Sequence, residues 1–332
     1  MRKQLLTLSL IIILCSFSGT VWGKPASEPG LTILHTNDVH GMLVPFDYNA
    51  LGKNEKDVGG AARRIALIRK LKKESVKPAI VMDAGDVFVR GPIEKLEGVP
   101  DFDVMNSVPY DVMTLGNNEF KGDQYTGKPS IEGLKILERR MKQAHFPVLC
   151  ANIFSRETGE ALTLPYVIFQ RGDMTIGIFG LSAPRIAECA QAATLEVRDP
   201  ISTAKEIVAE LEQKCNFIVA LTHIGYDLDL QLAREIPSID AIIGGDSHTW
   251  LPNPVPIKAA NPVGPEWWVG GPIVCQDGEW GKCLGRLDLA VRKDPSGQYL
   301  VTRYQAKLIN IDASIKPAGD VENIIRTVIV EN

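Results

Sequence analysis

The chain has 332 residues, with 36 basic and 40 acidic side chains and a formal net charge of −4. This balance, with no clustered basic stripe, argues against a nucleic-acid-binding surface. Beyond the N-terminal segment no apolar run approaches the roughly 20 residues that a membrane helix needs, so we expect no membrane span after that segment is removed.

The N-terminus has the pattern of a secretory signal peptide. Two basic residues precede a mainly apolar run, Leu8 to Cys15, and small residues follow it. Cleavage after Gly23 would leave one domain over residues 24–332, in the periplasm or outside the cell, and would remove residues 1–23 as a signal peptide. A lipoprotein signal is disfavoured because no small residue precedes Cys15.

Short apolar runs then alternate with amphipathic stretches whose apolar residues recur every three or four positions. This alternation is typical of an α/β architecture with largely parallel strands. The predicted strands are Leu31–Leu34, Ala79–Met82, Val112–Leu115, Val148–Leu149, Thr175–Leu181, Phe217–Thr222 and Ala241–Ile243. The predicted helices are Ala61–Lys73, Ile131–Ala144 and Ile201–Lys214.

The pattern changes after Gly244, where prolines and glycines crowd residues 252–272. The apolar runs that follow suggest antiparallel strands in a second sheet packed on the first, and the last residues suggest a helix. These strands are expected at Pro272–Cys275, Cys283–Val291 and Tyr299–Ile309, and the helix at Val321–Val330.

Five cysteines would remain after cleavage, so at least one would be unpaired in a monomer. Cys275 and Cys283 bracket a glycine-containing turn and could form a disulfide across a hairpin, since export permits one. Buried thiols are the equally open alternative, because cysteine is often a small core residue. The five are Cys150, Cys189, Cys215, Cys275 and Cys283.

Polar side chains follow five of the predicted strands. In open α/β sheets, ligands bind beyond the carboxyl ends of the strands, so these loops are expected to converge on one site. The five segments are HTNDVHG from His35, DAGD from Asp83, GNNE from Gly116, TH from Thr222 and GGDSH from Gly244.

Carboxylates and an amide mixed with imidazoles favour Zn, Mn or Fe over metals held by thiolates. Asp38 and His40 would point the same way, since alternate residues of an extended strand share a face. Asp86 could bridge two ions about 3.5–4 Å apart, or could simply cap a helix or form a turn. His35 and His145 are expected to lie outside the site.

With these motifs in view, the chain resembles the N-terminal metallophosphoesterase domain of the 5′-nucleotidase family, within the calcineurin-like superfamily. The resemblance implies a four-layer sandwich of two mixed β-sheets flanked by helices, the metallo-dependent phosphatase fold. It is carried by LHTNDVHG, DAGD, GNNEF, FPVLCAN, LTHIGYDLD, GGDSHT and QDGEWGKCLGRLDL.

The resemblance also implies two divalent metal ions, Zn, Mn or Fe, and attack on phosphorus by a metal-bound water or hydroxide. The expected partner is a small phosphorylated substrate, nucleotides among the candidates. One ion would be held by Asp38, His40, Asp86 and His248, and the other by Asp86, Asn117, His223 and Asp246.

The chain departs from the family pattern at three catalytic or ligand positions. Asn118 stands where the family has the histidine that stabilises the transition state, and Lys121 stands where an aspartate orients that histidine. We therefore expect Asn118 and Lys121 to occupy the catalytic positions, although an amide cannot supply a proton. Asp246 replaces a usual histidine ligand. The family's C-terminal domain, which holds the nucleobase, is expected to be missing, with Trp267 and Trp268 as a possible substitute stacking surface.

Three functions are consistent with these residues. The first is an exported metallophosphoesterase with low turnover, acting on phosphomonoesters or phosphodiesters. The second is a non-catalytic metal-binding or ligand-binding protein, suggested by the joint change at Asn118 and Lys121. The third is a sulfur-ester hydrolase on the same two metals, because a fold does not fix a reaction.

Overall fold

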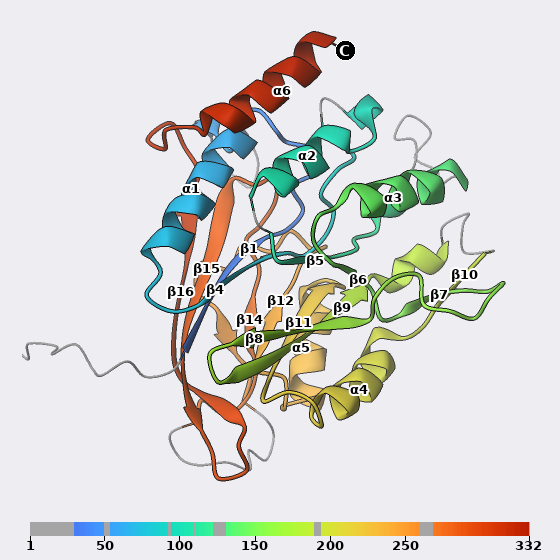
Figure 1. Cartoon of the computed structure of the whole chain (residues 1–332), viewed down its shortest axis with the longest axis vertical. Coiled ribbons are helices and arrows are strands. Elements are labelled where there is room, and N and C mark those ends of the chain that lie inside the picture. The colour runs from blue at the N-terminus through green and yellow to red at the C-terminus, as the bar shows by residue number, and fades with distance from the viewer. Residues whose placement is uncertain are drawn as a thin grey trace, which may run out of the picture.

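The structure is a computed structural model that describes residues 30–49, 54–91, 94–108, 110–121, 131–188, 194–258 and 268–331. The predicted signal peptide, Cys189 and Trp267 lie outside these ranges. Two six-stranded mixed sheets face each other, and helices cover the outer face of each (Figure 1). The predicted four-layer α/β arrangement is thereby confirmed.

The first sheet has the order β16-β15-β1-β4-β5-β6. Strands β1, β4, β5 and β6 run parallel, and β15 and β16 add an antiparallel edge next to β1. The bounds are β1 Gly30–Thr36, β4 Ala79–Asp83, β5 Val112–Thr114, β6 Val148–Leu149, β15 Cys283–Lys293 and β16 Tyr299–Asn310.

The second sheet has the order β13-β14-β12-β11-β9-β8. Its four inner strands are parallel, with β8 and β13 antiparallel at the edges. The bounds are β8 Tyr166–Arg171, β9 Met174–Ser182, β11 Phe217–His223, β12 Ala241–Ile243, β13 Val255–Pro256 and β14 Ile273–Cys275. Two small ribbons pair β2 (Phe46–Tyr48) with β3 (Glu55–Val58), and β7 (Ile153–Ser155) with β10 (Leu195–Val197).

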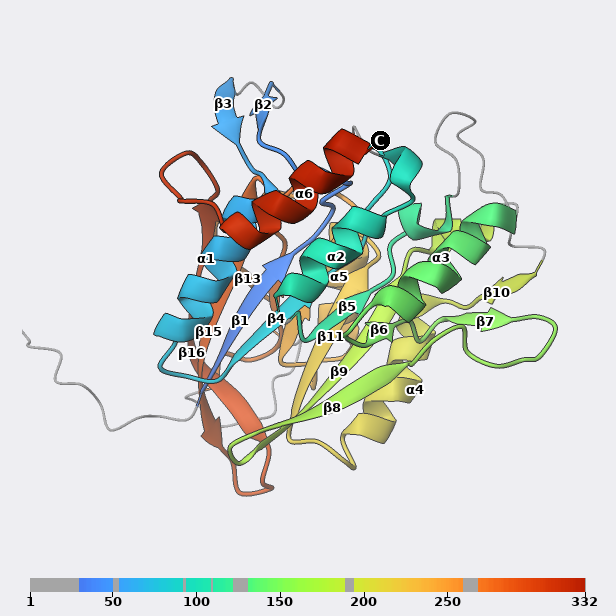
Figure 2. The same ribbon diagram turned by 45° about the horizontal axis from the view of Figure 1, so that its top comes forward.

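Helices α1, α2, α3 and α6 lie on the outer side of the first sheet, and α4 and α5 on that of the second (Figures 1 and 2). None of the helices within the described ranges is both long and apolar enough to cross a bilayer. The helices are α1 Ala61–Glu74, α2 Val99–Ser107, α3 Ile131–Gln143, α4 Pro200–Leu211, α5 Tyr226–Glu235 and α6 Gly319–Glu331. Short 3₁₀ turns are η1 Glu94–Leu96, η2 Asn118–Phe120 and η3 Pro184–Glu188.

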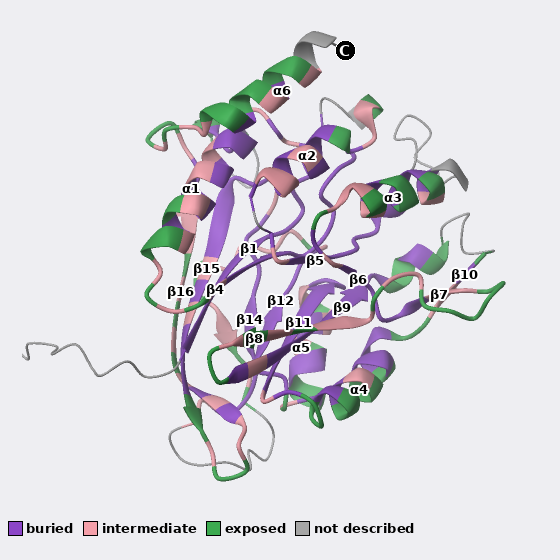
Figure 3. Cartoon of the chain, viewed as in Figure 1, coloured by how far each residue is buried: buried purple, intermediate pink, exposed green. Residues whose placement is uncertain are grey.

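The central strands are apolar on both faces, as strands covered on both sides must be. In β11, Val219 points into the core between the two sheets, whereas Ala220 points under α4 and α5. In β4, Met82 faces that same central core and Val81 packs beneath the helices of the first sheet. Figure 3 shows both sheets buried along most of their length. This two-sided burial fixes the register of the strands, and with it where each one ends.

The prediction for the C-terminal strands was wrong in two respects, sheet membership and the direction in which β14 pairs with β12. The two long strands β15 and β16 are antiparallel as predicted, but they extend the first sheet instead of forming a second one. The Pro272–Cys275 run contributes β14, which lies parallel to β12 in the second sheet. The apolar pattern shows which residues are buried, but it does not show which neighbour a strand pairs with.

The separation of these strands also rules out the hairpin disulfide. Cys275 ends β14 in the second sheet and Cys283 begins β15 in the first, and both are buried thiols, as are Cys150 and Cys215. Cys283 Sγ lies 3.2 Å from the Oδ1 atom of Asn310 on β16.

Gly180 is a point of close approach between the two sheets near the carboxyl ends of the strands. Its carbonyl accepts a 2.8 Å hydrogen bond from Ala151 N, and a Cβ atom at this position would lie 2.6 Å from the Cβ atom of Leu149. We predict that Gly180→Ala destabilises the protein by about 1–3 kcal/mol through overpacking. Chemical denaturation measures this. Gly319→Ala is the control, because nothing lies within 4 Å of the added methyl group, and an equal effect of the two substitutions would contradict the prediction.

Candidate metal centre

The polar residues singled out in the sequence meet where the carboxyl ends of the two sheets face each other. The first sheet supplies Asp38 and His40 after β1, Asp86 after β4 and Asn117 after β5. The second sheet supplies His223 as the last residue of β11, and Asp246 and His248 after β12. The centre is therefore assembled from both halves of the fold.

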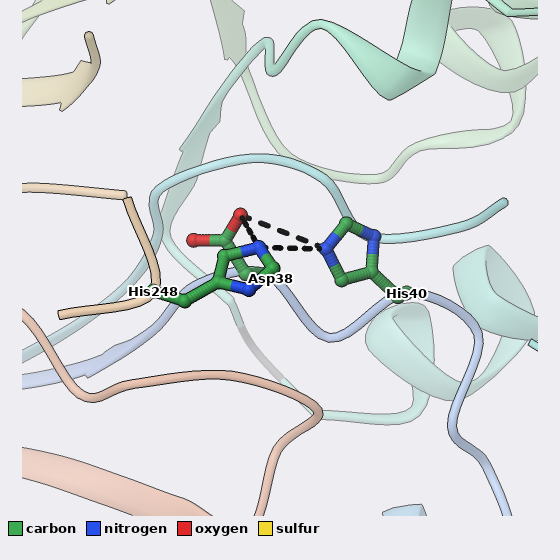
Figure 4. A group of neighbouring side chains, drawn as sticks. All are labelled: Asp38, His40 and His248. Carbon is green, nitrogen blue, oxygen red and sulfur yellow. Dashed lines mark hydrogen bonds and ion pairs between the residues drawn. The ribbon is translucent and has the colours of Figure 1, made fainter. Parts of the chain in front are cut away.

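Asp38, His40 and His248 form a first group of converging ligand atoms (Figure 4). Asp38 Oδ1 lies 3.2 Å from His248 Nε2 and 3.7 Å from His40 Nε2. The two Nε2 atoms are 3.2 Å apart. Two imidazole nitrogens and a carboxylate oxygen at such separations face one common point, as the ligands of a divalent ion do.

Asp86, His223 and Asp38 form a second group. His223 Nε2 lies 3.3 Å from Asp86 Oδ2 and 3.9 Å from Asp38 Oδ1, and Asp246 Oδ1 is 3.4 Å from the same nitrogen. Asp86 Oδ2 also lies 3.9 Å from His40 Nε2. Asp38 is therefore common to both groups, and Asp86 of the second group also approaches His40 of the first.

The backbone at these positions is as unusual as the side chains. Asp and His tolerate a left-handed conformation better than most residues with a Cβ atom, but it still costs roughly 1–3 kcal/mol when held in place. The positive φ angles are 49° at Asp38, 53° at His40, 58° at Asp86, 80° at Asp246 and 53° at His248. Asp38 and His40 are therefore brought together by a left-handed turn, and the extended strand end expected from the sequence is wrong.

Two buried ligand atoms of the centre lack a hydrogen-bond partner among the described residues: Asp38 Oδ1 and His223 Nε2. Burial lowers the pKa of His223, but the carboxylates of Asp86 and Asp38 outweigh this effect and raise it well above its usual value. Buried polar atoms are ordinarily satisfied, so the two atoms are open to a shared partner such as a divalent cation, which would take the place of the His223 proton. The mixed carboxylate and imidazole donors suit a divalent ion of the Zn, Mn or Fe type.

The two histidines of the second sheet are held by further acceptors. His223 Nδ1 donates to the carbonyl oxygen of Ala84 at 2.7 Å, which leaves Nε2 directed at the carboxylates. His248 Nδ1 lies 2.6 Å from Glu279 Oε2, and Glu279 also accepts from the hydroxyl of Tyr48 at 3.2 Å. Such partners fix the tautomer and orientation of ligating histidines. Glu279 was not predicted as a site residue, although it lies in the QDGEW segment just after β14.

Glu119 is a second residue that the sequence reasoning missed. Its buried carboxylate accepts hydrogen bonds from the backbone N–H groups of Asp86 at 2.9 Å, Val87 at 2.7 Å and Gly116 at 2.7 Å. Burial, reinforced by the Asp86 charge, raises the pKa of Glu119 to about 8. One side chain thereby ties the loop after β4 to the loop after β5.

Asn118 and Lys121 form a chain of hydrogen bonds that ends on Asp86. Asn118 donates its backbone N–H to Asp86 Oδ1 at 2.7 Å and its side-chain amide to Asp86 Oδ2. The Lys121 ammonium donates to Asn118 Oδ1 at 2.7 Å. Because the amide oxygen accepts from lysine while the amide nitrogen donates to aspartate, the orientation of the Asn118 side chain is fixed by both neighbours.

Arg185 is the third residue that was missed. It lies in η3, directly after β9, and its guanidinium donates to both carboxylate oxygens of Asp246 and to Asn117 Oδ1. Asn117 itself is 3% exposed and comes from the opposite sheet. A search for charged residues after every strand would have found Arg185, but a search for metal ligands passes over arginine.

His35 and His145 have no contact with the candidate ligands among the described interactions, as predicted. His35 is buried in β1 opposite Gly285, and burial lowers its pKa to about 4. His145 is exposed beyond α3, where its backbone N–H bonds to Asn106. Trp268 lies just before β14, and its predicted partner Trp267 falls outside the described residues.

Comparisons with known proteins agree with this geometry. The family model of the calcineurin-like phosphoesterases matches residues 31–250. Protein UshA of Escherichia coli K12 is 31% identical over 315 residues, covering 86% of this chain and 53% of that protein. The 2′,3′-cyclic-nucleotide 2′-phosphodiesterase/3′-nucleotidase of Haemophilus influenzae is 30% identical over 353 residues, covering 97% of this chain and 50% of that protein.

A crystal structure of the 5′-nucleotidase precursor from Thermus thermophilus has a TM-score of 0.77 and 30% identity, covering 91% of this chain and 59% of the other. This chain spans about half the length of the curated relatives described. The match of the family model, the shared fold and the converging Asp and His residues together show that the chain belongs to the calcineurin-like phosphoesterase family and is related to the 5′-nucleotidases and UshA.

Proposed function

We propose that the chain is an exported, two-metal phosphoesterase that hydrolyses phosphomonoesters or phosphodiesters. The observation that carries this proposal is the cluster of Asp38, Asp86 and His223 at the junction of the sheets, where two buried side-chain atoms lack a hydrogen-bond partner among the described residues. Export rests on the N-terminal pattern of residues 1–23, which lies outside the described residues.

In this proposal the first ion is held by Asp38, His40, Asp86 and His248. The second is held by Asp86, Asn117, His223 and Asp246. The approach of Asp86 Oδ2 to both His40 Nε2 and His223 Nε2 supports its role as the bridging ligand. When bound, the ions would neutralise the phosphoryl oxygens and activate the nucleophile.

The chain's own groups position and polarise the site. The Asn118 amide points its N–H toward the bridging carboxylate, and Lys121 withdraws charge from the amide oxygen. Asn118 can donate a hydrogen bond to a phosphoryl oxygen, but it cannot deliver a proton to a leaving group. We therefore expect turnover to be slow and to favour esters with good leaving groups.

The proposed substrate class follows from the relatives. Two of them carry nucleotidase or cyclic-nucleotide phosphodiesterase in their names, and both monoester and diester chemistry occur among them. Because this chain covers only about half of such proteins, nucleotide specificity is the least supported part of the proposal.

Asp86→Asn is expected to remove bound metal and to lower hydrolysis of p-nitrophenyl phosphate or bis(p-nitrophenyl) phosphate by about 10²-fold or more, because an electrostatic group at the reacting centre is lost. Metal analysis and initial rates measure the two effects. A chelator should likewise abolish activity, and Mn²⁺ or Zn²⁺ should restore it.

The matched control is Asp320→Asn, an exposed carboxylate on α6 that pairs with Arg69. It should keep both metal content and rate. Full activity of Asp86→Asn, or wild-type hydrolysis unaffected by chelation, would refute the two-metal assignment.

Asn118→His combined with Lys121→Asp is expected to raise turnover, since a positioned imidazole contributes roughly 10²–10⁴-fold as a general acid. The measurement is kcat for the same aryl phosphates, with metal content checked in parallel.

The change at these two positions also favours a second candidate function, a non-catalytic metal-binding protein. Wild-type turnover close to that of the double variant would exclude this second function, whereas activity in the double variant alone would support it.

A further inference from the structure

A positive charge built into the chain lies at the second group of ligands. Arg185 Nη1 donates to Asp246 Oδ2 at 2.6 Å, and Nη2 donates both to Asp246 Oδ1 and, at 2.5 Å, to Asn117 Oδ1. Asn117 follows β5 in the first sheet and Asp246 follows β12 in the second. One guanidinium nitrogen thus joins two oxygens from opposite sheets.

These oxygens are the ones assigned above to the second ion. An ion bound by both Asn117 Oδ1 and Asp246 Oδ1 would have to lie within bonding distance of the two, and Nη2 of Arg185 already lies within hydrogen-bond distance of both. A guanidinium and a divalent cation that contact the same two oxygens would lie close together and repel each other strongly in a partly buried site. Both cations cannot hold the same pair of oxygens in this arrangement.

The first group differs in this respect. Among the described residues, Asp38 accepts from Asn37 at 2.7 Å and from the backbone N–H of Asp246 at 2.9 Å, and His248 bonds to Glu279. No arginine or lysine hydrogen bond to these two side chains is found within the described ranges. Asp38 and His248 can therefore accept an ion without breaking a hydrogen bond to arginine or lysine, and the only arginine charge that acts on the third member, His40, among the described residues is that of Arg90.

Arg185 has somewhere to go when it is displaced. Its side chain is 48% exposed, whereas that of Asp246 is 8% exposed. It projects from the short turn η3, so this half-exposed side chain can swing outward into solvent. The Arg185 side chain can thus be displaced from Asp246, whose own side chain is buried.

We propose that Arg185 is an internal cation that competes with the second metal ion. In the metal-free protein it holds Asn117 and Asp246 together, and it must leave them before an ion binds there. Binding is consequently sequential. The first ion binds tightly at Asp38, His40 and His248, and the second ion then binds more weakly at Asn117 and Asp246. This inference rests on the proposed ligand assignment.

The test is a calorimetric titration of chelator-treated protein with Mn²⁺, in the wild type, Arg185→Gln and Arg185→Lys. The wild type should show one tight and one weak site. Arg185→Gln should tighten the second site by about tenfold or more, equivalent to about 1.4 kcal/mol, and leave the first unchanged. Arg185→Lys keeps the charge and should stay closer to the wild type.

Arg198→Gln is the matched control, because Arg198 pairs with Glu196 away from the centre, and it should change neither constant. Electron paramagnetic resonance gives an independent readout, since coupled Mn²⁺ pairs should form at lower Mn²⁺ concentration in Arg185→Gln. Thermal unfolding checks that each variant is folded.

Unchanged or weaker second-site binding in Arg185→Gln would overturn the proposal, because Arg185 would then support the ligands instead of competing for them. If Arg185→Gln still bound two ions with unchanged or weaker second-site affinity, the two-metal assignment would stand although the competition by Arg185 would be refuted. Absence of Mn²⁺ and Zn²⁺ binding in all variants would instead refute the metal centre itself and the inference with it.

Discussion

The mutual repulsion of buried carboxylates is the constraint on which the centre depends. Asp38, Asp86 and Asp246 each place a carboxylate oxygen 3.3–3.9 Å from His223 Nε2, and their side chains are at most 8% exposed. Uncompensated charges in such surroundings are costly, so cations must be present. The protein supplies some positive charge through protonated histidine and Arg185. The negative charge that remains uncompensated gives the cluster its affinity for divalent ions.

Holding such a cluster together requires a rigid frame. The sheets supply it, since each ligand lies within a few residues of the end of a strand that is buried on both faces. Glu119 adds a connection between two loops by accepting three backbone N–H groups. A left-handed backbone at five candidate ligand positions persists because the surrounding structure holds these residues in it despite its cost in conformational free energy.

Much of this could be read from the sequence, for physical reasons that differ between features. Apolar runs predicted the central strands, because burial on both faces leaves a continuous signal that does not depend on neighbours. Helices α2 and α5 were missed: α2 carries a proline in its first turn and α5 is short and acidic at its start, so neither shows a long apolar stripe. Sheet membership of β14 and β15 was unpredictable, because pairing depends on contacts between distant segments.

The same distinction applies to the site. The candidate ligands were predicted from residue type and from position after a strand, which are local properties. Three other roles depend on contacts between segments that are distant in the sequence. Glu119 accepts hydrogen bonds from backbone N–H groups, Glu279 orients a histidine, and Arg185 donates to oxygens from both sheets. The ligands span residues 38 to 248, so the centre cannot exist until both sheets have formed and docked. Without metal ions, the chain must hold its most repulsive cluster together using only its own charges.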